Sequence, residues 1–170
     1  MNSPLSAQSS SVSAARFDEL VRAHASAVSG YLGRRSFPLG SGDVDDLVAE
    51  TLIIVWRRLD DVPEGAELAW MLGVARRVLA NARRSHRRRQ RREAVGFERF
   101  QPAAEARVVA DEALSQALAA LSPGERDVLL ASVWDGLSID QIAVLYKTTP
   151  GAAATRVARA RERFIQAYSA

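Results

Sequence analysis

The chain contains no cysteine, two histidines and, among 23 basic residues, only one lysine. Without cysteine it can form no disulfide, thiolate metal site or cysteine nucleophile. His24 and His86 are the only imidazoles, so a metal site would have to rely on carboxylates. The serines lack histidine partners, and the sequence has no glycine-rich phosphate loop. No catalytic constellation stands out, and we expect no metal or other cofactor.

Long hydrophobic runs are missing as well. No stretch reaches the roughly 18 consecutive apolar residues that cross a bilayer. Residues 1–16 are rich in serine and alanine, and they have neither the basic start nor the apolar segment of a signal peptide. We therefore expect a cytoplasmic protein without membrane insertion, whose residues 1–15 form a disordered tail.

Charges of opposite sign are separated along the chain. Between Arg76 and Arg92 there are nine arginines and no carboxylate, whereas Asp43 to Glu67 contains eight carboxylates and two arginines. This separation indicates one surface suited to a polyanion and a neighbouring surface suited to another partner. A basic run can also be a solvated helix face or an unstructured arm, so the run alone does not decide between these interpretations.

Hydrophobic periodicity favours helices throughout, because β-branched residues are few and no convincing period-two alternation occurs. We expect an all-α fold of two small domains joined by a flexible linker. The domains would be residues 16–93 and 109–170, and the linker residues 94–108. Apolar stripes predict helices within residues 17–32, 44–59 and 68–82 of the first domain. In the second domain, helices are expected over residues 108–121, 123–134, 139–146 and 150–168.

Capping residues mark the starts of several helices. Asp43 is the expected N-cap of the second helix, whose apolar stripe includes Trp56. Ser122 with Glu125, and Ser138 with Gln141, have the spacing of capping boxes. Thr149 precedes a proline and is the expected N-cap of the last helix.

The last two predicted helices have helix-turn-helix spacing, with Lys147 and Thr148 in the turn. In that motif, the start of the second helix enters the major groove of DNA. Its outward residues would be Thr149, Ala152, Thr155, Arg156 and Arg159. The alternative is a helical hairpin in an ordinary bundle, and the caps Ser138 and Thr149 would be structural in either case.

The third predicted helix carries an aromatic residue beside its arginines. Trp70 lies off the apolar stripe, on the side that also carries Arg77, Asn81 and Arg84. A ring beside guanidinium groups can stack on unpaired bases, each stack being worth about 1–3 kcal/mol. A lone tryptophan near a helix start is nevertheless often a core residue, so both interpretations stay open.

The acidic helix is apolar on more than one face. Asp46, Glu50 and Arg57 share it with Leu47 and Ile54. A helix of this kind usually meets a partner or is fully enclosed. It could also present a simple solvated face.

Five pieces of the sequence, in this order, resemble the extracytoplasmic-function sigma factors of bacterial RNA polymerase. They are Asp43-Val-Asp-Asp-Leu-Val-Ala-Glu-Thr-Leu52 with Trp56, Ala69-Trp-Met-Leu-Gly-Val-Ala-Arg76, Ala120-Leu-Ser-Pro-Gly-Glu-Arg-Asp-Val128, Leu137-Ser-Ile-Asp-Gln-Ile-Ala143 and Gly151-Ala-Ala-Ala-Thr-Arg-Val-Ala-Arg-Ala-Arg161. Each piece is weak alone, but their order and spacing together are specific. The resemblance covers about residues 17–168.

The resemblance implies that the protein directs core RNA polymerase to promoters and helps to melt the −10 element. In the first domain, the expected polymerase-binding residues are Asp46, Leu47, Glu50, Ile54 and Arg57. The expected −10 DNA-binding residues are Asp61, Trp70, Arg77, Asn81, Arg84, Arg87 and Arg88. In the second domain, −35 DNA would contact Ser138, Thr149, Ala152, Thr155, Arg156 and Arg159.

The partners implied by the resemblance are core RNA polymerase, promoter DNA as duplex and as melted strand, and an anti-sigma protein. The active protein would be associated with the nucleoid. Two other hypotheses remain at this point. The first is a stand-alone helix-turn-helix regulator, and the second is a helical adaptor that binds an acidic protein or a membrane surface.

Two departures from the family pattern concern the helix-turn-helix. Lys147 occupies a turn position where glycine is usual, and a left-handed conformation there would cost a residue with a side chain about 1 kcal/mol or more. Residues 152–154 are all alanine, which offers only methyl contacts to bases. We therefore expect −35 recognition to depend on Arg156, Arg159 and DNA shape.

Overall fold

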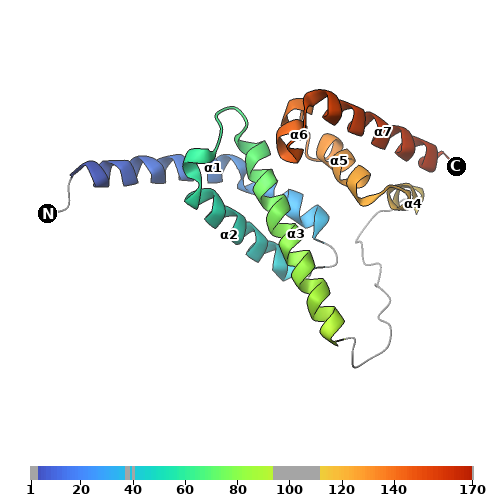
Figure 1. Cartoon of the computed structure of the whole chain (residues 1–170), viewed down its shortest axis with the longest axis horizontal. Helices are drawn as coiled ribbons and strands as arrows, with labels where there is room; N and C mark the ends of the chain where they lie inside the picture. Colours follow the sequence, from blue (N-terminus) through green and yellow to red (C-terminus); the bar gives the residue numbers. More distant parts are fainter. Residues whose placement is uncertain (1–3, 37–38, 40, 94–111, 170) are drawn as a thin grey trace. The chain divides into compact units, whose positions relative to one another are not determined.

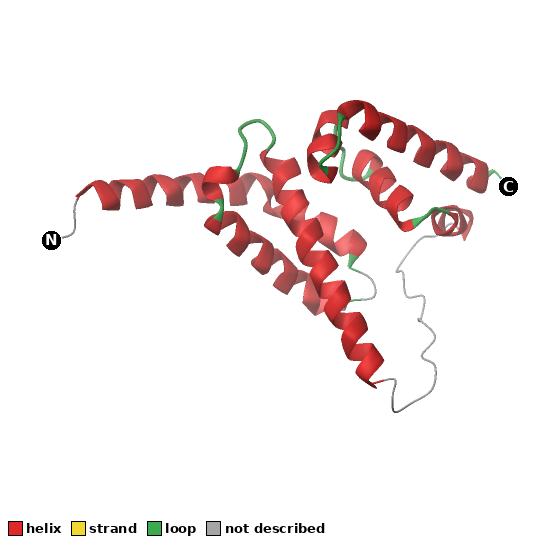
Figure 2. Ribbon diagram, in the orientation of Figure 1, coloured by secondary structure: helices red, strands yellow, loops and turns green. Residues whose placement is uncertain are grey.

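The computed structural model describes residues 4–36, 39, 41–93 and 112–169. Within these residues the protein consists of seven α-helices and one short 3₁₀ helix, with no strand (Figures 1 and 2). The chain divides into two compact units, residues 1–100 and 101–170, which are described separately. The all-α fold is confirmed, whereas the expected linker, residues 94–108, lies outside the described residues. None of the described helices is long and apolar enough to cross a membrane.

Three long helices form the first unit: α1 (Pro4–Arg35), α2 (Ser41–Arg57) and α3 (Glu67–Glu93). The short helix η1 (Leu59–Asp61) lies between α2 and α3. Each of the three long helices packs on the other two. Their shared core buries side chains from every helix, and burial of each large one stabilises the fold by about 1.5–3 kcal/mol. The largest fully buried members are Tyr31, Leu32, Val55, Met71 and Leu72.

The N-terminal part of α1 differs from the expectation of a disordered tail. The helix begins at Pro4, and the next glycine or proline is Gly30. A helix that is nucleated by packing from Leu20 onward can continue through the alanines and serines, because propagation costs much less than nucleation. Val12 is 69% exposed, so this extension gains little from tertiary contacts. Figure 1 shows it reaching beyond α2 and α3.

Two predictions about α2 were wrong. The helix begins at Ser41, which places Asp43 inside the first turn instead of at the N-cap. Its buried row is Leu47, Thr51 and Val55, spaced by four residues, so Trp56 falls outside it and is 45% exposed. The Trp56 ring meets Phe17 of α1 edge-on, with the ring centroids 5.1 Å apart.

The long helix α3 has two different halves. Residues 69, 71, 72, 74, 75, 78 and 79 are buried in the core of the unit. From residue 84 to residue 92, every side chain except His86 is exposed. The helix continues to Glu93, well beyond residues 68–82, to which its apolar stripe limited the predicted helix.

Four helices form the second unit: α4 (Glu112–Ala120), α5 (Pro123–Val133), α6 (Ile139–Tyr146) and α7 (Pro150–Tyr168). The last helix packs against the other three. Ala153, Val157 and Ala160 of α7 are buried, and their small size allows close packing at these positions. Residues 108–111, where the first of these helices was expected to begin, lie outside the described residues.

The turn between α6 and α7 has the left-handed conformation that the sequence made costly. Lys147 has φ 50° and ψ 55°. Its N–H donates to the carbonyl of Val144 at 3.2 Å, and the N–H of Thr148 donates to Ala143 at 2.9 Å. These two bonds form a Schellman motif, which satisfies the last carbonyls of α6 and directs the chain into α7.

Candidate functional site

A basic face runs along the exposed side of α3. Arg77, Asn81, Arg84 and Arg88 are separated by four, three and four residues, so they lie on one side of the helix. All four are exposed, and Arg84 donates a hydrogen bond to the side-chain oxygen of Asn81. We call Arg77, Asn81, Arg84 and Arg88 the basic face. Trp70 lies on the same side of the helix, seven residues before Arg77.

Arg87 is also exposed, but it lies beside the basic face rather than within it. No ion pair within the described residues involves Arg77, Arg87 or Arg88. The guanidinium groups along this side of α3 are therefore available to an external anion.

Arg83 is the member of the arginine run that turns inward. It is partly buried and donates to the backbone carbonyl of Arg35, the last residue of α1. Arg35 is buried, and its guanidinium lies 3.9 Å from the ring centroid of Tyr31. A cation at the C-terminal end of a helix is stabilised by the helix dipole. Arg83 therefore connects α3 to α1. Its position outside the basic face could have indicated this inward role.

The loop between α2 and α3 is fixed by side chains of α1 and α3. Arg16 of α1 donates to the backbone carbonyl of Val62 at 2.9 Å. Gly65, with φ 76°, donates its N–H to the carboxylate of Glu67 at 2.9 Å. Hydrogen bonds from the backbone N–H groups of Glu67 and Gly65 lower the pKa of Glu67 below its ordinary value. No local pattern indicated this contact of Arg16, because its partner Val62 lies 46 residues away in the chain.

Asp61, expected to contact −10 DNA, already has a partner within this loop. Oδ2 of Asp61 lies 2.8 Å from Nη2 of Arg58. The Arg58 guanidinium also lies over Trp70, with Cζ 5.5 Å from the ring centroid. Trp70 is partly buried, so it combines the core and surface roles that the sequence left open. Sequence analysis missed Arg58.

The acidic face of α2 is formed by Asp46, Glu50, Ile53 and Arg57, spaced by four, three and four residues. All four are exposed, and Ile53 retains 50% of its surface. No ion pair within the described residues involves Asp46 or Glu50. The carboxylates of Asp46 and Glu50 are therefore not neutralised by ion pairs with the arginines of α3.

One predicted polymerase-binding residue is not on this surface. Leu47 is only 4% exposed, because it belongs to the buried row of α2, and it cannot offer a direct contact. Ile54 is partly exposed beside the acidic face. From the sequence, Trp56 was placed in the apolar stripe of this helix, and no partner contact was assigned to Ile53. The structure exposes both.

A groove of about 380 Å³ separates α2 from the C-terminal half of α3. One wall carries Asp43, Asp46 and Glu50, and the other carries His86 and Arg89. Nε2 of His86 is buried without a hydrogen-bond partner among the described residues. Within the described residues, no group of three or more histidine and carboxylate side chains could hold a metal ion.

The predicted −35 residues of the second unit divide into caps and exposed side chains. Ser138 accepts the N–H of Gln141, and Thr149 accepts that of Ala152, each at 3.2 Å. Both hydroxyls thus complete helix N-termini. Ala152 is partly exposed.

Thr155, Arg156 and Arg159 are exposed on the same side of α7. The hydroxyl of Thr155 donates to the carbonyl of Gly151 at 3.0 Å, so its proton is already used within the helix. The two arginines therefore provide the unengaged polar groups of this face.

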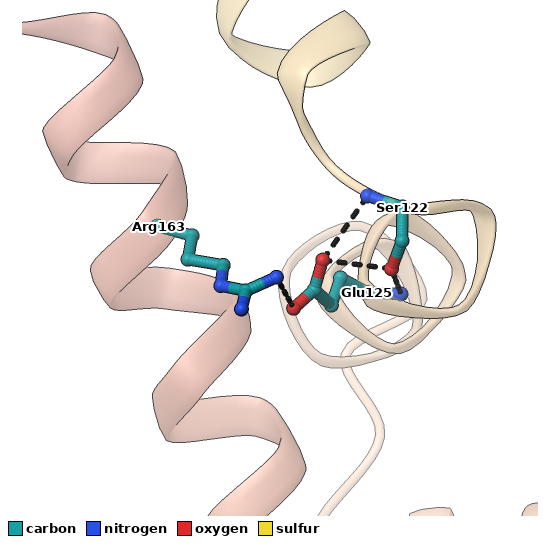
Figure 3. Close-up of polar contacts among 3 residues, drawn as sticks. All are labelled: Ser122, Glu125 and Arg163. Carbon is teal, nitrogen blue, oxygen red and sulfur yellow. Dashed lines mark hydrogen bonds and ion pairs between the residues drawn. The ribbon is translucent and has the colours of Figure 1, made fainter.

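A polar cluster links α7 to the start of α5 (Figure 3). Nη1 of Arg163 lies 2.6 Å from Oε1 of Glu125. The other carboxylate oxygen of Glu125 accepts the N–H of Ser122 at 3.0 Å and its hydroxyl at 2.7 Å. The capping box was predicted from the sequence, whereas the contact with Arg163 was not.

Comparison with known proteins agrees with this arrangement. Residues 20–89 match the sequence model of sigma-70 region 2, and residues 111–164 match that of sigma-70 region 4. The RNA polymerase sigma factor CnrH of Cupriavidus metallidurans is 28% identical over 173 residues, covering 94% of this chain and 90% of CnrH. The RNA polymerase sigma factor CarQ of Myxococcus xanthus is 29% identical over 155 residues, covering 86% of each chain.

Two solved structures share the fold. The sigma factor RpoE from Bartonella quintana, crystallised with the anti-sigma factor NepR, has a TM-score of 0.65 and 22% identity, covering 90% of this chain and 96% of RpoE. CnrH in complex with the cytosolic domain of CnrY has a TM-score of 0.58 and 24% identity, covering 88% of this chain and 85% of CnrH.

The two matched regions together span well over half of the chain, in the order that the sequence pieces predicted. This result does not favour the stand-alone regulator. The chain belongs to the extracytoplasmic-function sigma factors, which direct transcription initiation by bacterial RNA polymerase.

Proposed function

We propose a division of labour within the first unit: the acidic face of α2 binds core RNA polymerase, and the basic face of α3 captures the opened −10 strand. The observation that carries this proposal is the separation of charge. Asp46 and Glu50 on α2, and Arg77, Arg84, Arg87 and Arg88 on α3, are exposed without ion pairs between them. Each surface is thus available to a different partner.

The chemistry of α2 favours a protein partner. Ile53 and Trp56 are 50% and 45% exposed, and Ile53 lies on the same face of the helix as Asp46 and Glu50. DNA phosphates would repel those carboxylates, whereas a partner with basic side chains and an apolar patch would complement them. Leu47 contributes by holding α2 in the bundle.

The chemistry of α3 favours an opened strand. Arg77, Arg84, Arg87 and Arg88 can neutralise phosphates, which would make binding fall steeply with salt. Trp70 at the start of this row offers a partly exposed ring near the loop that contains Asp61. A cationic track that ends at an aromatic residue suits single-stranded DNA, because unpaired bases can stack while phosphates follow the track.

The second unit would read −35 duplex DNA with the start of α7. Arg156 and Arg159 can contact phosphates or guanine edges, and the methyl group of Ala152 can contact thymine. Since Ser138 and Thr149 use their hydroxyls as caps, they would position the helix, and they could contact phosphates only through remaining lone pairs. Recognition would therefore depend on few base contacts and on DNA shape.

Regulation and location follow by analogy. RpoE of Bartonella quintana was crystallised with the anti-sigma factor NepR, and its fold is similar to that of this chain. This protein would likewise be held inactive by an anti-sigma protein. It would act in the cytoplasm, associate with the nucleoid when active, and leave the chemistry of RNA synthesis to the polymerase.

The test is reconstitution with purified core polymerase from the same bacterium. The chain should co-elute with core enzyme and create discrete transcription start sites on a pooled genomic template. Core enzyme alone provides the background. The proposal fails if the chain does not bind core enzyme, or if it binds palindromic duplex DNA tightly and creates no start site.

A further inference from the structure

Arg58 connects two parts of the proposed strand-binding site. Its Nε donates to Oδ2 of Asp61 at 2.8 Å, and its Nη2 lies 2.8 Å from the same oxygen. The guanidinium also lies over Trp70, with Cζ 5.5 Å from the ring centroid. The Arg58 side chain thereby couples the position of the Asp61 carboxylate to the position of the Trp70 ring.

The loop has anchors that do not involve Arg58. Arg16 holds the carbonyl of Val62, and the Val62 side chain is 3% exposed. Glu67 holds the N–H of Gly65. Loss of the Arg58 side chain should therefore leave the loop folded and change only the placement of Asp61 and Trp70.

A carboxylate in a site for DNA needs an explanation, because phosphates repel it. Asp61 has 55% of its side-chain surface exposed, so it is open to solvent and to a ligand. Arg58 compensates its charge through Oδ2. Oδ1 has no hydrogen-bond partner among the described residues, and it can accept from the exocyclic amino group of a base. A keto oxygen at the same place would be repelled.

We propose that Arg58 is a specificity-determining residue of the opened-strand site. It holds Asp61 so that Oδ1 reads the C4 or C6 position of an unpaired base, where cytosine and adenine carry an amino group and thymine and guanine carry a keto oxygen. Its guanidinium plane, supported by Trp70, stacks on that base. This inference rests on the proposed capture of the opened strand by α3.

The test is a selection with the reconstituted complex of the full chain and core polymerase. The probe is a pool of forked DNA molecules whose duplex arm comes from a promoter mapped with the same complex, and whose single-stranded −10 segment is randomised. Sequencing the bound fraction gives the base preference at each position. With the unaltered chain, one position should be enriched in adenine or cytosine by about tenfold.

Arg58→Gln should reduce the enrichment at that position to about twofold or less, with the preferences at other positions retained. Asp61→Asn should also reduce the enrichment at that position, because an amide both donates and accepts hydrogen bonds and therefore discriminates less between bases. Arg22→Gln is the matched control: Arg22 is exposed on α1, lies outside the proposed surfaces, and should leave every preference unchanged.

Trp70 gives a second readout that does not depend on DNA. In a Trp56→Phe, Trp134→Phe background, Arg58→Gln should raise acrylamide quenching of Trp70 while the thermal midpoint stays near that of the background. Full retention of the base preference in Arg58→Gln, or enrichment of thymine or guanine at the affected position, overturns the inference. Absence of any selected sequence with the unaltered chain instead refutes strand capture itself.

Discussion

Arg163 Nη1 lies 2.6 Å from Glu125 Oε1, and this ion pair ties the C-terminal half of α7 to the first turn of α5. Because Glu125 also closes the capping box of α5, one carboxylate serves two helices. The placement of the proposed −35 helix thus depends on a contact about one helical turn beyond Arg159, the last of its proposed DNA-binding residues.

This arrangement predicts a pH dependence. Hydrogen bonds from the Ser122 side chain and backbone, with the nearby Arg163, lower the pKa of Glu125 below its ordinary value of 4.5. A depressed pKa in the folded state contributes stability above about pH 4.5, and this contribution is lost as the pH falls through the folded-state value. The difference in urea midpoint between the unaltered chain and Glu125→Gln should therefore narrow as the pH is lowered from 6 to about 3. If this difference in urea midpoint stayed constant with pH, the proposed contribution of ionised Glu125 to stability would be contradicted.

Charge reversal at one residue of the basic face and at the neighbouring Arg87 should separate strand opening from polymerase binding. Arg84→Glu combined with Arg87→Glu should abolish strand opening, measured by permanganate reactivity of the −10 region, because phosphates would then be repelled. Binding to core polymerase, measured by co-elution, should stay near normal. Arg22→Glu reverses one charge on α1 and serves as the control. If the double variant lost polymerase binding instead, the two surfaces would be misassigned.

The acidic face offers a matched pair of substitutions. Asp46→Arg should weaken binding to core polymerase by about tenfold or more, since it reverses a charge within the proposed interface. Asp45→Arg makes the same change one residue earlier, on a different side of α2, and should have a much smaller effect. Fluorescence anisotropy of labelled chain titrated with core enzyme measures both. Equal losses for the two variants would indicate a long-range charge effect rather than a contact.

Lys147→Gly should stabilise the second unit. The left-handed conformation at φ 50° costs glycine less than lysine, and the expected gain is about 0.5–1 kcal/mol in the free energy of unfolding. Urea denaturation monitored by circular dichroism measures this change in the free energy of unfolding. Lys147→Ala retains the Cβ penalty and should give no such gain. A destabilised Lys147→Gly variant would show that the lysine side chain has a role of its own.

The −35 face can be tested through salt dependence. Arg159→Ala should weaken binding of the polymerase complex to duplex −35 DNA and reduce the slope of log affinity against log salt by about one, as expected when one phosphate contact is lost. Arg161→Ala removes an arginine from another side of α7, where it reaches Ser132, and should leave the slope unchanged. An unchanged slope for Arg159→Ala would remove that residue from the proposed phosphate contacts.

The sequence predicted the helices well because their apolar periodicity and capping residues are local signals. Ser122, Ser138 and Thr149 cap the helices that they were expected to cap. The errors at Leu47 and Trp56 arose within a correctly predicted helix. Apolar residues on α2 exceed the buried row, and only the packing against α1 and α3 decides which ones are enclosed.

Contacts between elements were beyond the reach of the sequence. Arg83 was counted with the other arginines, although it binds the end of α1. Arg16 and Arg58 gave no signal, because their partnerships depend on how the loop folds back on α1 and α3. Charge separation predicted the two surfaces, but only three-dimensional packing showed which side chains are left available on each.

The C-terminal half of α3 adds little buried surface to the first unit, since residues 84–92 are exposed apart from His86. Mutations in residues 84–92 should change the free energy of unfolding very little, while they change the affinity for the melted strand. The affinity for the melted strand can thus change during evolution through this stretch, one arginine at a time, without first requiring compensating changes in the scaffold that carries it.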